Sequence, residues 1–338
     1  MASPYLALLN FDQNVGSVHL ARKLILLLHA AVIHAAHVAS SGHHPLSYLQ
    51  AIVLGLFQGV AELFPISSLG HIVLIPDLFG WHGIVNAEDK PESFYLAFVV
   101  MMHVANALAL LGFFWKDWVR IIKAFFQSIA KRRVETSSER LAWLIVIATI
   151  PVGIIGLILE KPLRENMLRP LPAAIFLVVN GLILIAGERF RRRSEVRELA
   201  AREGTTPEGS RRLDTMAYTE AGIIGVAQTL ALLAGISRDG IAMVVGLVRG
   251  LNNEDAAKFA FLLATPVILA AGFLKLPDLF GPNGHGVLGQ TLVGSAVAFV
   301  ASLFAVRFLV GYFKSKNLVP FGVYCLIFGI FMVFFVAI

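Results

Sequence analysis

Charged residues are scarce in this sequence, and cysteine is nearly absent. Asp, Glu, Lys and Arg make up 15% of the 338 residues, whereas a soluble domain carries roughly 25%. The single cysteine, Cys325, excludes a disulfide within the chain and any cysteine-based metal cluster. Residues 1–20 lack the basic start, apolar core and small-residue cleavage site of a signal peptide, so we expect no such signal there.

Apolar residues, in contrast, are abundant. They make up 57% of the chain and form long continuous runs, which are not the alternating pattern of a membrane β-barrel. At about 20 residues per span, the length suits about six to eight membrane spans plus shorter pieces. We therefore predict an all-α polytopic membrane protein. The net charge of +6 is typical of basic cytoplasmic loops, and we expect no nucleic-acid partner.

The apolar runs predict about six full transmembrane helices. They lie at about 94–115, 141–159, 172–187, 257–275, 288–312 and 318–338. The basic loops 116–140, 188–214 and 314–317 are then cytoplasmic by the positive-inside rule. These loops can all be cytoplasmic only if segments 48–80 and 217–251 each return to the side of the membrane that they entered from. The sequence therefore predicts two re-entrant helix hairpins, the first from the outer face and the second from the cytoplasmic face.

Two regions follow from this pattern. Residues 48–338 form the predicted membrane domain. Residues 1–47 are an extension in which Arg22 and Lys23 precede an apolar, histidine-containing stretch. We expect that stretch to form an interfacial helix, and a histidine metal tract is the less favoured alternative.

The most informative stretch is GLFQGVAELFPISSLGH, residues 55–71, because it is polar within an apolar region. Its polar side chains are Gln58, Glu62, Ser67, Ser68 and His71. Gln58 and Glu62 are four residues apart and share one helix face, and a Pro65 break follows. Ionisable groups at membrane depth are costly, so they usually face a protected cavity and have a function there.

The stretch has a counterpart 170 residues further along the chain. Residues 55–70 and 225–240 are identical at seven of sixteen positions. Five of these matches fall mainly on the helix break and its polar neighbours: Gly55 with Gly225, Gln58 with Gln228, Ile66 with Ile236, Ser67 with Ser237 and Gly70 with Gly240. With opposite entry sides, this is the pattern of an inverted-topology repeat, which places binding sites near the midplane.

The two break loops, 65–70 and 235–240, are expected to face each other. Each starts a half-helix whose free N–H groups carry partial positive charge, and Gly235 and Gly240 allow close backbone approach. Arg238 adds a multi-donor cation suited to phosphate oxygens. The sequence therefore predicts that the cavity binds an anion, with phosphate as the favoured one.

The other side chains of the first loop suggest phosphoryl chemistry. Glu62 is expected to bind a divalent metal or to move a proton. Ser68 and His71 are alternative nucleophiles towards phosphorus, with the other one assisting. For Ser67 and Ser237, a role as simple helix caps is as well supported by the sequence as a direct catalytic role.

These residues give the chain its resemblance to the undecaprenyl pyrophosphate phosphatase (bacitracin-resistance) family of bacteria. The first family motif stands here as Gln58-Gly59-Val60-Ala61-Glu62 followed by Pro65-Ile66-Ser67-Ser68-Leu69-Gly70-His71. The second stands as Ala234-Gly235-Ile236-Ser237-Arg238-Asp239-Gly240-Ile241-Ala242. The likeness covers about residues 48–338. The chain departs from the family pattern at Gln58, Leu69, Ala234, Asp239 and Ala242, where many members have Glu, Thr, Pro, Ser and Thr.

The resemblance implies a membrane phosphatase-like domain that removes the terminal phosphate of undecaprenyl or a related polyprenyl diphosphate. That reaction recycles the lipid carrier for cell-wall synthesis and confers bacitracin resistance. It also implies a bacterial plasma-membrane location, a site open to the outer face, and Mg²⁺ or Ca²⁺ as cofactor. The implied catalytic residues are Glu62, Ser68, His71 and Arg238, with Glu62 as metal ligand. The implied substrate-binding residues are Gln58, Ser67, Ser237, Gly235 and Gly240.

Rival functions remain open from the sequence. An inverted repeat is shared with transporters, so a flippase for a phosphorylated polyprenyl lipid is one alternative, and a non-catalytic binder of that lipid is another. A homodimer is also left open. We expect the polar span residues His103, Asn106 and Gln228 to form interhelical hydrogen bonds and not to belong to the site.

Overall fold

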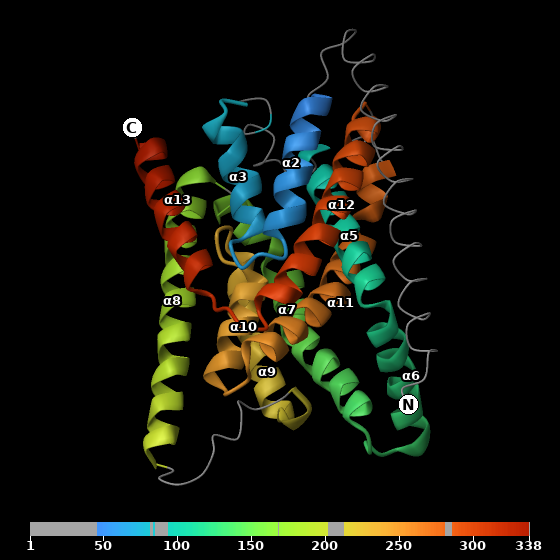
Figure 1. Cartoon of the computed structure of the whole chain (residues 1–338). Helices are drawn as coiled ribbons and strands as arrows, with labels where there is room; N and C mark the ends of the chain where they lie inside the picture. Colours follow the sequence, from blue (N-terminus) through green and yellow to red (C-terminus); the bar gives the residue numbers. More distant parts are fainter. Residues whose placement is uncertain are drawn as a thin grey trace, which may run out of the picture.

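The computed structural model describes residues 46–81, 84, 94–167, 169–201, 213–280 and 286–337, and within these ranges the chain is helical with no strand (Figure 1). The predicted extension of residues 1–47 lies outside them except for its last two residues. The longer helices are α5 (Phe94–Phe113), α6 (Trp115–Lys131), α7 (Ser137–Met167), α8 (Pro170–Ala201), α11 (Asn253–Phe280), α12 (Leu288–Tyr312) and α13 (Val319–Ala337). The shorter helices are α2 (Tyr48–Ala61), α3 (Ser68–Leu78), α9 (Tyr218–Ala227) and α10 (Arg238–Val248), with 3₁₀ turns η2 (Leu213–Thr215) and η3 (Gln228–Leu232).

Six of the described helices are long and apolar enough to cross a membrane. These candidate spans are Phe94–Phe113, Ser137–Leu159, Pro170–Arg192, Asn253–Leu274, Leu288–Tyr312 and Val319–Ala337. Their outward side chains are large and apolar, as at Phe273, Phe304 and Ile327, because hydrocarbon surrounds them instead of water. The predicted all-helical, multi-pass architecture is confirmed.

Two segments predicted as loops are helical instead. Residues 115–131 form α6, because apolar residues recur every three or four positions along one face and basic residues occupy the other. Helix α8 continues past its span into the charged segment and ends at Ala201. Near the end of the span, the buried Glu188 pairs with Arg191 at 2.7 Å, one helical turn away, because a buried carboxylate needs a charge partner.

The short helices form two pairs that approach each other from opposite ends of the molecule (Figure 1). Helices α2 and α3 run from one end to a turn in the middle, and α9 and α10 do so from the other end. Helix α2 begins with a capping box, in which the Ser47 hydroxyl accepts from Gln50 N and the Gln50 side chain accepts from Ser47 N. The turns of the α2–α3 pair and the α9–α10 pair, which are far apart in the sequence, therefore face one another.

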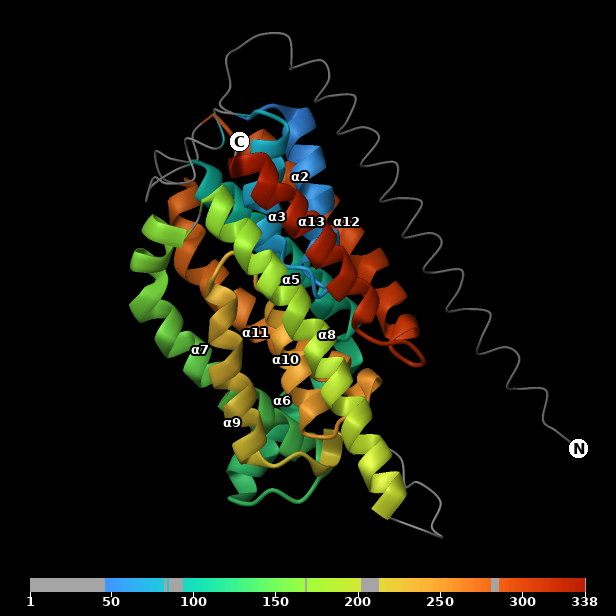
Figure 2. The ribbon, with the colours of Figure 1, turned by 90° about the vertical axis from the view of Figure 1, so that its left-hand side faces the viewer.

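Glycines let these turns and their supports approach closely. A Cβ built on Gly70 would lie 2.9 Å from the Cα of Gly235, and Gly235 itself has φ +105°, which favours glycine. Helix α12 packs against α2 at Gly55 and Gly59, where an added Cβ would strike the α12 backbone. Helix α13 packs along α8 on the other flank (Figure 2). Small residues at such contacts are typical of helix packing in membranes.

Candidate active site

The site is centred on Glu62, the buried C-cap of α2. Its Oε1 accepts a hydrogen bond from Arg238 Nη2 at 2.7 Å, and its Oε2 accepts from Gln58 Nε2 at 3.0 Å. The hydroxyl of Ser68 also donates to Oε2. A buried carboxylate is tolerated only where a charge partner and donors satisfy it. The first repeat thus supplies the carboxylate and the second supplies its cation.

Ser68 is the first residue of α3 and faces the same hollow as Glu62. The helix start turns its side chain towards the end of α2, six residues back in the chain. A serine hydroxyl that donates to a carboxylate is arranged to lose its proton when it attacks. The structure therefore brings together the predicted nucleophile Ser68 and the predicted carboxylate Glu62.

His103 in α5 is a site neighbour that the sequence interpretation assigned to interhelical packing. Its Nδ1 lies 2.8 Å from the carbonyl oxygen of Val99, and its Nε2 lies 3.2 Å from Glu62 Oε2. The carbonyl can only accept, so Nδ1 carries a proton. A second proton must then lie between Nε2 and the carboxylate. The available signal was its place in the middle of a span, where an ionisable group marks a function by default.

Arg238, the first residue of α10, joins the two carboxylates. Besides its bond to Glu62, its Nε lies 3.4 Å from Asp239 Oδ1. Asp239 is buried, and within the described part of the chain neither of its oxygens has a hydrogen-bond partner. The guanidinium keeps limited exposure towards the hollow. Arg238 is thus shared between a well-satisfied carboxylate and a poorly satisfied one.

The serines preceding these residues act as matching helix caps. Ser67 Oγ accepts from Gly70 N at 3.2 Å, and Ser237 Oγ accepts from Gly240 N at 3.1 Å. Ser67 Oγ also accepts from Gly235 N at 3.1 Å, which ties the first turn to the second. Capping, which the sequence left as an equal alternative, is therefore observed for both serines, and Gly235 and Gly240 provide the capped or bridged N–H groups.

Asn180, in the middle of α8, is a second bridge between the turns. Its Nδ2 donates to the carbonyl of Pro65, and its Oδ1 accepts from Ser237 N, each at 3.0 Å. The side chain is fully buried. No sequence motif marked it, because a lone asparagine in a span usually bonds between helices. Its contacts show that α8 sets the spacing of the two turns.

His71 lies away from the hollow, although the sequence grouped it with Ser68. Its ring is buried and stacks near Phe57, Tyr324 and Phe328. Nδ1 is 2.7 Å from Ser67 O, so it donates to this carbonyl, and Nε2 is 2.8 Å from the Tyr324 hydroxyl, from which it accepts. The structure therefore places His71 behind the first turn, and its catalytic role stays a prediction.

The two matched glutamines occupy different positions. Gln58 is buried behind Glu62 and donates to it. Gln228 lines the hollow and donates to the carbonyl of Ala148 at 2.7 Å. Gln58 therefore holds the carboxylate, whereas Gln228 anchors the second helix pair on α7.

The hollow between the turns has a volume of about 170 Å³. Glu62, Ser68, His103 and Arg238 form its polar side, and apolar residues from η3, α7 and α11 close the other side. Helices α3 and α10 both begin here, so their first N–H groups add positive potential. The arrangement combines a hydroxyl, a base and a cation around a space suited to a phosphoryl group.

The predicted metal can be tested against these donors. Among the described residues, no group of three or more His, Cys, Asp or Glu side chains could hold an ion. Glu62 is the carboxylate that faces the hollow, and its oxygens already accept from Arg238 and Ser68. Mg²⁺ often binds one or two carboxylates together with substrate phosphates and water. A metal ion that enters with a diphosphate and binds Glu62 therefore stays a prediction.

Fold and site together define a multi-pass membrane protein with a phosphate-type site between two helix-turn pairs. The family model described as bacitracin resistance protein BacA matches residues 51–331. The chain belongs to this family, which confirms the resemblance seen in its two motifs.

Curated relatives cover most of the chain. It is 53% identical over 332 residues to undecaprenyl-diphosphatase 2 of Frankia alni, with 85% of this chain and 97% of the relative aligned. It is 52% identical to undecaprenyl-diphosphatase of Mycolicibacterium paratuberculosis, over 84% and 95% of the two chains. The identity to undecaprenyl-diphosphatase 2 of Burkholderia ambifaria is 41%, over 83% and 94%.

Proposed function

We propose that the protein is an undecaprenyl-diphosphatase, which hydrolyses undecaprenyl diphosphate to the monophosphate and phosphate. This activity recycles the lipid carrier of cell-wall synthesis and confers bacitracin resistance. The observation that carries the proposal is the hydrogen bond from Ser68 to Glu62 beside Arg238, in a hollow inside the helical bundle. The named activity of relatives at 53% and 52% identity supports the same reaction.

The first step is attack by Ser68 Oγ on the terminal phosphorus. A bond forms between this oxygen and phosphorus, the anhydride P–O bond breaks, and the polyprenyl monophosphate leaves. Glu62 Oε2 takes the Ser68 proton, for which the observed hydrogen bond is already aligned. Serine is favoured over His71 as nucleophile because Ser68 faces the hollow and both His71 nitrogens are engaged elsewhere.

The second step is hydrolysis of the phosphoserine. A water molecule attacks phosphorus, the bond between phosphorus and Ser68 Oγ breaks, and Glu62 returns to this oxygen the proton that it took in the first step. Glu62 takes one proton from the attacking water and passes it to the phosphate. Phosphate is then released, and the starting state is restored. His103 lies against the same carboxylate oxygen and holds the proton that they share.

Arg238 and the helix starts stabilise the charge of the transferring group. The guanidinium has several donors in a planar fork, so it can keep its contact with Glu62 while it binds phosphate oxygens. The N-terminal N–H groups of α3 and α10 point their dipoles at the same space. A divalent ion, Mg²⁺ or Ca²⁺, would bind Glu62 together with the diphosphate and neutralise part of the substrate charge.

We infer a membrane topology from the charge at the two ends. Helix α6, whose basic residues include Lys116, Arg120 and Lys123, runs towards the end from which α9 and α10 rise (Figure 1), so we take this end as cytoplasmic. The α2–α3 pair is then a re-entrant hairpin from the outer face of the bacterial plasma membrane. The α9–α10 pair enters from inside, and the two form an inverted repeat. The site opens to the outer face.

Phosphate release by the purified protein tests the function. We expect release from undecaprenyl diphosphate, loss of release in Glu62→Ala, and a lower rate with a chelator. Lipid flipping in liposomes without phosphate release would instead support a flippase. Saturable lipid binding with neither activity would support a non-catalytic binder. Wild-type activity in Glu62→Ala would remove Glu62 from the mechanism.

A further inference from the structure

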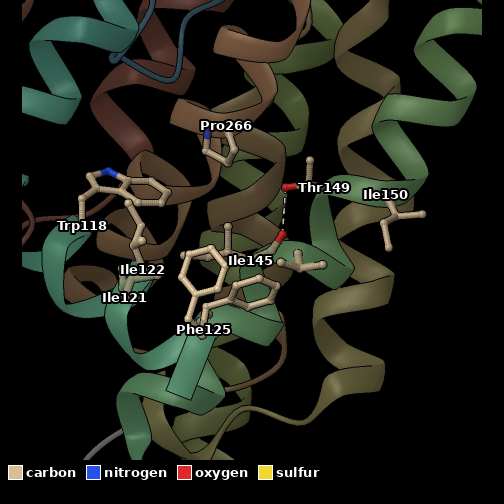
Figure 3. A pocket seen from close by; sticks show the side chains of 11 residues that line it. Trp118, Ile121, Ile122, Phe125, Ile145, Thr149, Ile150 and Pro266 are labelled. Carbon is tan, nitrogen blue, oxygen red and sulfur yellow. Dashed lines mark hydrogen bonds between the residues drawn. The ribbon is translucent and has the colours of Figure 1, made fainter. Parts of the chain in front are cut away.

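A second, larger hollow lies beside the site, between α6, α7 and α11. Its volume is about 410 Å³, which is within the usual range for small-molecule sites. Figure 3 shows Trp118, Ile121, Ile122 and Phe125 of α6 facing Ile145 and Thr149 of α7, with Pro266 of α11 nearby. The sequence treated the α6 segment as a loop and suggested no role for this surface.

The walls of this hollow are apolar. Two lining residues carry a polar side-chain atom. The Thr149 hydroxyl donates to the carbonyl of Ile145 at 2.8 Å (Figure 3), and the buried Trp118 indole N–H has no hydrogen-bond partner among the described residues. A hollow of this kind repels charged or hydrogen-bonding ligands and accepts hydrocarbon.

The hollow lies next to the hollow of the active site. On α7, Thr149 lines the larger hollow and Val152 lines the catalytic one, and residues three apart share a helix face about 4.5 Å apart along the axis. On α11, Pro266 lines the larger hollow, and the next residue, Val267, lines the catalytic one. The two hollows therefore lie next to each other along α7 and α11.

The hollow also opens to the lipid-facing surface. Ile122 and Phe126 of α6 and Ile150 of α7 line it and are about half exposed or more. A long hydrocarbon chain can therefore enter sideways from the bilayer and need not thread through a closed tunnel.

We propose that this hollow binds the first part of the polyprenyl chain while the diphosphate lies between Ser68 and Arg238. The inference rests on the proposed function and extends it to the lipid part of the substrate. Because the bilayer is as apolar as the hollow, burial alone gives little affinity. The hollow selects by shape, and it aims the diphosphate at Ser68 by holding the chain beside it.

The test uses a polyprenyl diphosphate that carries a photoreactive diazirine within its first few isoprene units, in liposomes with the full-length protein. We expect phosphate release from this analogue and, after illumination, labelling of peptides from α6 and α7 that contain residues 118–126 and 142–150. Labelling confined to other helices would overturn the tail site while leaving the function intact. Labelling of the hollow by a photoreactive phospholipid but not by the analogue would also overturn it.

Kinetics give a second, matched test. Val146→Trp fills the hollow, whereas Ile154→Trp places a tryptophan at an exposed position of α7 outside the hollow. We expect Val146→Trp to lower kcat/KM for the long-chain substrate about tenfold, because the displaced chain no longer aims the diphosphate at Ser68, and to leave isopentenyl diphosphate unaffected. Ile154→Trp should change neither. Equal effects of both variants on both substrates would refute the tail site, and no release by the wild type would refute the function itself.

Discussion

Ser67 and Ser68 are adjacent, but the structure gives them separate roles that alanine substitution can distinguish. Ser68→Ala removes the hydroxyl that attacks phosphorus. Loss of a nucleophile lowers kcat by at least about 10³-fold. Glu62 keeps its bonds from Arg238 and Gln58, so the free energy of unfolding changes by no more than about 1 kcal/mol. The variant should be folded and inactive.

Ser67→Ala should behave in the opposite way. It removes the acceptor for Gly70 N and Gly235 N, and each unsatisfied buried N–H costs about 1–3 kcal/mol, so the loss of stability is about 2–6 kcal/mol. Ser67 also has φ 70°, so Ser67→Gly, which tolerates this φ, should lose less. The kcat of the folded fraction should fall far less than in Ser68→Ala.

Phosphate release and thermal unfolding in the same detergent measure both effects. More than about a tenth of wild-type kcat in Ser68→Ala would contradict the roughly 10³-fold loss expected for a nucleophile. An unchanged unfolding midpoint in Ser67→Ala would contradict the bridge between the turns.

Three further predictions concern the second repeat and its support. Arg238→Lys keeps the charge but loses the planar fork of guanidinium donors, so KM for the diphosphate should rise at least about tenfold. Initial rates that show an unchanged KM would exclude a contact between Arg238 and the phosphate. Asp239→Asn removes a buried carboxylate that has no hydrogen bond within the described chain. The free energy of unfolding should rise by roughly 1 kcal/mol, and KM for the diphosphate should fall. A lower melting point of the variant would contradict this. Asn180→Leu removes the bonds to Pro65 O and Ser237 N, so kcat should fall about tenfold or more, whereas Asn180→Asp, which keeps the acceptor for Ser237 N, should retain more activity.

The sequence predicted the architecture well where hydrophobic length decides it. Six apolar runs became six candidate spans, and the 170-residue repeat indicated that two turns would meet, as Ser67 and Gly235 do. The amphipathic helix α6 was mistaken for a loop because its charges were counted without its apolar face. Charge density alone does not distinguish a solvated loop from an interfacial helix.

The site was predicted only in part, because sequence motifs do not show which way a side chain points. Glu62, Ser68 and Arg238 were predicted together and lie together. His71 and Ser68 are three apart on α3, yet the His71 ring turns into an aromatic cluster behind the turn. His103 and Asn180 reach the site from helices that carry no motif. For His103 the one sequence signal was an ionisable group within a span, whereas Asn180 is revealed only by the packing of α8.

The most direct test of the account is the identity of the residue that becomes phosphorylated during turnover. Rapid quenching of the enzyme with undecaprenyl diphosphate, followed by digestion at neutral pH and mass spectrometry, reports it. The account predicts phosphoserine at Ser68 that forms and decays at rates compatible with kcat and is absent in Glu62→Ala. Phosphohistidine at His71, or turnover without any phosphorylated residue, would contradict it.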